Sequence, residues 1–84
     1  MNYTVIWVPQ AEDDLTNAWL AATDQLAVTN AAHRLDSALE RHPFEIGLKR
    51  NSSVNRTAVD LPLGSDYEII EDDKTVRVIH AWLV

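Results

Sequence analysis

A group of basic residues in the middle of the chain is the strongest candidate for chemistry or binding. Its four members are Arg41, Lys49, Arg50 and Arg56. With Glu45 as the only acid among them, segment 41–56 carries a net charge of +3, on a chain whose formal net charge is −6. Residues 43–56 lack hydrophobic periodicity and predict a long loop, a kind of segment that is often functional. Such side chains on a loop can reach phosphates or carboxylates, so we expect a target contact; the alternative is a solvated loop that binds nothing specific.

Arg77 and His80 are further candidates near the end of the sequence. They lie in residues 75–83, whose alternating pattern predicts a β-strand. Regular alternation places them on opposite faces, so we do not expect them to act as one pair. His80 would share its face with Val78 and Trp82, where a half-buried core histidine is the commoner outcome. Arg77 could point to an open sheet surface.

Other patterns are weaker. His33, Asp36 and Glu40 share a helix face at spacings compatible with a metal site, although a solvated polar face is the more common outcome. The chain has no cysteine and no dinucleotide-binding, phosphate-cradling or zinc-protease motif, so we expect neither metal nor cofactor. All three tryptophans fall on apolar faces, which predicts core positions; a base-stacking platform is the alternative.

The elements that must position these residues are predicted from periodicity. Residues 3–8 are β-branched and aromatic, which indicates a strand covered on both faces. Pro9 and the acids that follow it predict a helix over about 9–22. Thr23 and Asp24 can cap a second helix that ends before Pro43. The facing surfaces of these two helices are alanine-rich, which predicts close approach.

A period of two begins at Thr57 and predicts three strands, at 57–61, 67–71 and 75–83. Residues 63–66 and 72–74 are the expected turns. With 84 residues the chain forms one domain, 1–84. The prediction is an α+β fold of order β-α-α-β-β-β: an antiparallel meander with a helical hairpin packed on one face. The place of the first strand in the sheet stays open.

Charge and hydropathy narrow the classes of partner. A formal net charge of −6 argues against a surface that binds nucleic acid directly and tightly. No apolar run approaches the ~20 residues of a membrane span, and the first residues lack a basic signal-peptide region. We therefore expect a cytoplasmic protein without membrane contact.

Three stretches, in this order, resemble the RelE/ParE toxin superfamily. They are the opening strand and helix start at residues 3–15, the Pro-Phe-Glu-Ile-Gly connection at 43–47, and the closing hairpin with an acidic turn at 67–82. The resemblance covers nearly the whole chain. It implies the same β-α-α-β-β-β order, a role in a type II toxin–antitoxin system of the plasmid-stabilisation kind, and a cognate antitoxin as partner.

The resemblance also implies two targets, the ribosome for RelE-like mRNA endoribonucleases and DNA gyrase for ParE-like toxins. Nuclease members of similar length place a His-Tyr pair where this chain has Leu83 and Val84, and an arginine where it has Ser65 and Asp66. We therefore expect a ParE-like toxin that acts by binding. An mRNA endoribonuclease and a non-toxic scaffold are the alternatives. The candidates for target binding are Lys49, Arg50, Arg56, Arg77 and His80.

Overall fold

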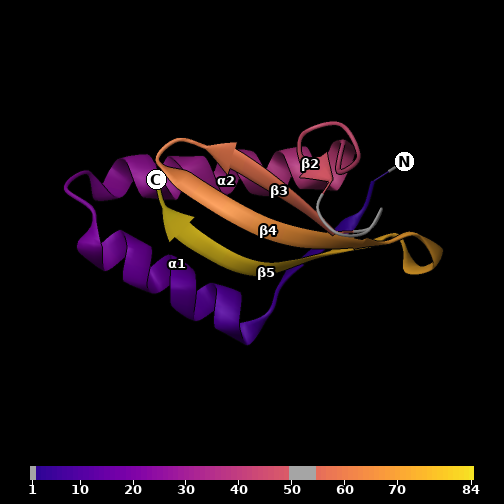
Figure 1. Ribbon diagram of the computed structural model, residues 1–84, viewed down its shortest axis with the longest axis horizontal. Helices are drawn as coiled ribbons and strands as arrows, with labels where there is room; N and C mark the ends of the chain where they lie inside the picture. Colours follow the sequence, from indigo (N-terminus) through magenta and orange to yellow (C-terminus); the bar gives the residue numbers. More distant parts are fainter. Residues whose placement is uncertain (1, 50–54) are drawn as a thin grey trace.

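A five-stranded mixed sheet and two helices make up the computed structural model, which describes residues 2–49 and 55–84 (Figure 1). The elements are β1 (Thr4–Trp7), α1 (Pro9–Ala21), α2 (Gln25–Arg41), β2 (Leu48–Lys49), β3 (Asn55–Asp60), β4 (Leu63–Ile70), the 3-10 helix η1 (Glu71–Asp73) and β5 (Thr75–Leu83). The strand order is β1-β5-β4-β3-β2. The α+β fold and the β3-β4-β5 meander are thus confirmed. The first strand, whose place the sequence left open, pairs in parallel with β5.

Both helices begin where their capping residues predict. Pro9 occupies the first turn of α1, where its missing N–H is no loss. The Asp24 carboxylate accepts a hydrogen bond from the Ala27 amide at 3.0 Å and so caps α2. That helix ends at Arg41, since His42 precedes a proline and avoids helical angles. No helix in the described ranges is long and apolar enough to cross a membrane.

The core lies between α2 and the sheet. Along α2 the residues Val28, Ala31, Ala32, Leu35 and Leu39 are buried at helical spacing. They belong to one hydrophobic cluster with Tyr67 and Ile69 of β4 and Val76 and Val78 of β5. Complete burial of a valine, leucine or isoleucine side chain stabilises the fold by about 1.5–3 kcal/mol. The larger aliphatic residues of this cluster therefore dominate the packing.

Residues 63–66, predicted as a turn, are part of strand β4, and the chain turns at Leu61 and Pro62 instead. Leu63 is fully buried, and the Ser65 hydroxyl donates to the Ala58 carbonyl of β3 at 3.1 Å. Gly64 lies beneath the Trp82 indole, where a Cβ atom would come within 2.5 Å of the ring. Close packing, rather than a turn, accounts for the Gly-Ser pair.

A β-bulge changes the faces of β5. Tyr67 of β4 pairs with Val78 and Asp66 pairs with His80, which leaves Ile79 as an extra residue. Beyond the bulge Ala81 is buried, whereas His80 is exposed like Arg77. The expectation that Arg77 and His80 lie on opposite faces is therefore wrong. Both lie on the sheet face away from the buried side chains.

Candidate functional site

The basic segment divides into residues with different surroundings. Arg41 is exposed in the last turn of α2, where a cation complements the helix dipole. Lys49 is exposed on β2, directly opposite Arg56 of β3. Arg50 lies outside the described residues. The expectation of a continuous loop fails here, because residues 48–49 and 55–60 are paired strands.

Arg56 is an internal clamp. Its side chain is only 7% exposed, and its Nη2 atom donates to the Phe44 carbonyl at 2.8 Å and to the Gly47 carbonyl. Tyr67, opposite Arg56 in the β3–β4 register, donates its hydroxyl to the Pro43 carbonyl at 2.6 Å. Together they hold the connection after α2 against the sheet. The expectation that Arg56 is a free charge on a loop is therefore wrong.

Tyr67 remains a proton donor in this clamp. Its burial raises the pKa of the phenol, while the neighbouring Arg56 guanidinium lowers it, and the net direction is upward. A phenol with a raised pKa stays protonated at neutral pH. The hydroxyl can therefore donate to the Pro43 carbonyl under all ordinary conditions.

On the open face of the sheet, each polar candidate has a partner. Arg77 Nη1 lies 2.5 Å from Glu68 Oε1, directly across β4 and β5. The Thr57 hydroxyl donates to Asp66 at 2.5 Å. His80 Nδ1 lies 3.5 Å from Asp14 Oδ2 of α1. In the described part of this face Arg77 and His80 are paired with carboxylates rather than free, which is a poor arrangement for gathering phosphates.

Asp14, which sequence reasoning missed, fastens α1 to the edge of β5. The β1 pairing ends at Val78, and beyond it the Ala81 amide donates to Asp14 at 3.1 Å instead of to a strand. Gln10 donates to the same carboxylate at 2.9 Å. Burial raises the pKa of Asp14, but the hydrogen bonds from Gln10, Ala81 and His80 outweigh it and leave this pKa below its ordinary value. In the sequence Asp14 was one of three acids after Pro9, which gave only a helix-start signal.

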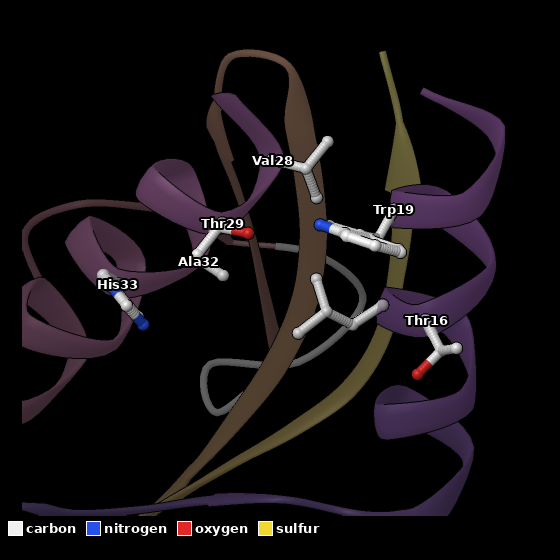
Figure 2. A pocket seen from close by; sticks show the side chains of 7 residues that line it. Thr16, Trp19, Val28, Thr29, Ala32 and His33 are labelled. Carbon is white, nitrogen blue, oxygen red and sulfur yellow. The ribbon is translucent and has the colours of Figure 1, made fainter. Parts of the chain in front are cut away.

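The other prominent feature is a groove between α1 and α2. It encloses about 280 Å³ and is lined by Leu15, Thr16, Trp19, Val28, Thr29, Ala32 and His33. Figure 2 shows the Trp19 indole reaching from α1 toward Val28 of α2. A second hollow continues the groove to Trp7, Glu12 and Asp36. The expectation of an alanine-lined contact is wrong at the groove, because the large side chains of Leu15 and Trp19 line it together with Ala32.

The tryptophans also differ from expectation. Trp19 is 39% exposed and Trp82 is 38% exposed, so neither is a core residue; Trp7 is half-buried and donates to Asp36 at 3.1 Å. Asp36 is thereby engaged, and Glu40 accepts from Asn2 at 3.2 Å. Within residues 2–49 and 55–84, no three potential ligands come close enough to hold a metal ion.

Solved structures of known toxins share this fold. A toxin–antitoxin complex, RelBE2 of Mycobacterium tuberculosis, matches with a TM-score of 0.80 and 20% identity over 100% of both chains. A mutant of the Escherichia coli toxin RelE in the free state matches with a TM-score of 0.76 and 13% identity, over 99% of this chain and 84% of that one. The chromosomal ParDE system of Pseudomonas aeruginosa matches with a TM-score of 0.73 and 12% identity, over 98% and 96%.

No protein-family model matches the sequence, and no curated protein matches it significantly. The structural likenesses show that the chain has the RelE/ParE toxin fold, as its sequence motifs predict. Since both RelE and ParDE structures are similar to it, the fold does not separate the two branches.

The Arg56 clamp predicts a stability difference between two neighbouring basic residues. Arg56→Ala leaves the Phe44 and Gly47 carbonyls without their donor, and we expect a loss of about 2 kcal/mol or more. Lys49→Ala, the matched control on an exposed site, should change stability by less than about 0.5 kcal/mol. Urea unfolding followed by tryptophan fluorescence measures both. Equal midpoints for the two variants would contradict the clamp.

The Asp14 contacts predict a pH dependence. Because its folded-state pKa is lowered, the charged carboxylate stabilises the native state above the unfolded-state pKa of ~3.9, and this stabilisation is lost as pH falls through the folded-state value. The difference in melting temperature between wild type and Asp14→Asn should therefore be largest near neutral pH and shrink in acid. Asp13→Asn, at an exposed neighbour, is the control. A difference independent of pH would show that charge on Asp14 is unimportant.

Proposed function

We propose that this protein is the toxin-like component of a type II toxin–antitoxin system, that it acts by binding as ParE-like toxins do, and that a cognate antitoxin neutralises it in the cytoplasm. The observation that carries the proposal is the apolar groove between α1 and α2, in which Trp19 stands 39% exposed. An exposed tryptophan beside an apolar groove is typical of a protein interface. The fold shared with toxins that are solved with their antitoxins supports the same partner.

The groove indicates the chemistry of the antitoxin segment. Its apolar floor suits one face of an amphipathic helix, with large side chains spaced to meet Leu15, Trp19 and Val28. At the end of the groove Glu12 is exposed, while Asp36 is held by the Trp7 indole. We expect a lysine or arginine of the antitoxin to pair with Glu12, since an acidic toxin favours a basic partner surface.

The state of the basic residues favours binding over RNA cleavage. Arg56 is occupied by backbone carbonyls and Arg77 by Glu68, so neither is free to stabilise charge on a cleaved phosphate. Leu83 and Val84 carry no side-chain proton for acid–base catalysis. Lys49, Arg50, Arg77 and His80 remain proposed contacts to the target, and Lys49 is exposed on β2. DNA gyrase is the target that a ParE-like role implies.

One observation keeps an mRNA endoribonuclease as the alternative. His80 is exposed on the open face beside the Asp14 carboxylate, and an imidazole oriented by a carboxylate can act as an acid or base. Its weakness is the absence, among the described residues around it, of an unpaired arginine or lysine that could hold the phosphate.

The groove predicts that two tryptophans of equal exposure differ in antitoxin binding. Trp19→Ala removes a large apolar contact in the groove and should weaken binding by at least about tenfold. Trp82→Ala is the matched control: it removes a 38% exposed tryptophan from the open sheet face and should change affinity less than about twofold. The protein encoded next to this gene, co-expressed and then titrated by calorimetry, is the partner to use. A loss confined to Trp82→Ala would place the antitoxin on the sheet instead.

The paired charges predict that the protein does not cleave mRNA. A positioned acid or base contributes typically 10²–10⁴-fold to such a reaction, and among the described residues of the open face Arg77, the cation nearest to this role, is paired with Glu68. Primer extension on translated mRNA after induction should show no new codon-specific ends. Cuts that disappear in His80→Ala would establish the nuclease alternative.

A further inference from the structure

Basic residues gather on the exposed face of α2, although the net charge of the chain is −6. A hollow of about 440 Å³ on this face is lined by His33, Arg34, Ser37, Ala38, Arg41 and His42. Within the part of the chain that the structure describes, this lining contains no acid. The sequence as a whole has thirteen Asp and Glu residues against seven Lys and Arg residues, so a hollow of this composition is unusual for the molecule. We call it the basic hollow.

The two acids in the same stretch of α2 point to another neighbour. The Asp36 carboxylate accepts a hydrogen bond from the Trp7 indole of β1 at 3.1 Å. Glu40 accepts one from Asn2, just before β1, at 3.2 Å. This helix therefore separates its charges: the carboxylates are held on the side of β1, and the arginines remain on the exposed face.

Both arginines of the basic hollow retain donors for a ligand. Arg34 holds Asp60 through Nε and Nη2, at 3.1 and 2.8 Å, and its Nη1 atom has no partner among the described residues. Arg41 forms no ion pair within residues 2–49 and 55–84. Since a helix rises about 1.5 Å per residue, α2 advances about 10 Å from Arg34 to Arg41, which is two turns on one face. The hollow is thus suited to two carboxylates about 10 Å apart.

We propose that the basic hollow binds an acidic segment of the antitoxin. His33 lines this hollow and both parts of the groove between α1 and α2, and Figure 2 shows it on the side of the groove away from Trp19. A segment that leaves the groove beside His33 therefore enters the basic hollow directly. Guanidinium groups form strong, charge-assisted hydrogen bonds with carboxylates. The inference rests on the proposed function, because the groove determines where the segment arrives.

A short acidic segment fits the basic hollow better than a nucleic acid does. The lining extends from residue 33 to residue 42, which is about 14 Å of helix. A phosphate backbone would continue beyond it over a molecule of net charge −6, where acids such as Glu45 stand exposed beside His42. Repulsion outside the hollow would then offset attraction inside it. A segment with two or three acids ends where the favourable surface ends.

Two substitutions that add the same charge to the same helix test the proposal. Ser37→Glu supplies a carboxylate to Arg34 and Arg41 from within α2, so it should weaken binding of the protein encoded next to this gene at least about tenfold. Asn30→Glu is the matched control: Asn30 is exposed on α2 but does not line the hollow, and affinity should change less than about twofold. Calorimetry at about 0.05 M and about 0.5 M salt measures both, and the loss in Ser37→Glu should shrink at high salt. Glutamate favours helix, and thermal unfolding verifies that both variants are folded.

Trp19→Ala separates this inference from the proposed function, because it tests the groove alone. If Trp19→Ala weakens the complex while Ser37→Glu leaves it as tight as in wild type, the inference is overturned and the proposed function stands. Equal losses in Ser37→Glu and Asn30→Glu would also overturn it, since added charge anywhere on α2 would then suffice. A single-stranded RNA that binds the wild type but not Ser37→Glu would identify a phosphate site instead. If the neighbouring protein does not bind at all, both proposals fail.

Discussion

The pairing of the first strand with the last is the interaction on which the rest of the structure depends. Thr4 to Trp7 lie in parallel register with Thr75 to Val78, so the two ends of the sequence meet in the sheet. The Thr4 amide donates to the Lys74 carbonyl at 2.8 Å, and the Val8 amide donates to the Val78 carbonyl at 3.1 Å. Because this contact closes a loop of nearly the whole chain, forming it costs the conformational entropy of a long loop. Helix α1 packs mainly on β5, so it gains its packing surface only once β5 is in place.

The shortness of β1 determines what happens along β5. Past Val78 the edge of β5 has no strand neighbour, and α1 covers it through the Asp14 carboxylate. The bulge at Ile79 turns Ala81 inward beneath α1 and His80 outward beside Asp14. One structural requirement, the protection of a strand edge, thus accounts for the position of the histidine that most resembles a catalytic group.

Local signals made much of this fold predictable from the sequence. Pro9, Asp24 and Pro43 mark helix boundaries through the backbone of their immediate neighbours, and strand 75–83 follows from its own alternation. Features that depend on distant contacts were not predictable. Arg56 resembles a loop cation until the carbonyls of Phe44 and Gly47 are placed beside it. Residues 63–66 resemble a turn because Gly64 is explained only by Trp82, eighteen positions later.

In the candidate site, too, local features were predictable and features that depend on distant contacts were not. Residue types identified possible cations, but whether a cation is free depends on which carboxylate or carbonyl the fold brings to it, as Glu68 does for Arg77. The groove was missed for a related reason: the alanines suggested close packing, while the large side chains of Leu15 and Trp19 also line the space between the helices.

The core, RNA cleavage and partner binding place different requirements on the sequence. This difference explains how the fold can be kept at 12–20% identity to known toxins. The core asks only for apolar side chains of suitable volume at helical or alternating spacing, a demand that many sequences meet. RNA cleavage requires particular charged groups in a particular geometry, and here the Arg56 guanidinium is bound to backbone carbonyls. Binding through an apolar groove constrains the sequence more than the core does and less than RNA cleavage does, since it needs shape and hydrophobicity at a few positions such as Trp19. A chain that retains the fold and an exposed groove, while Arg56 and Arg77 are held by internal contacts, agrees with the binding role proposed above.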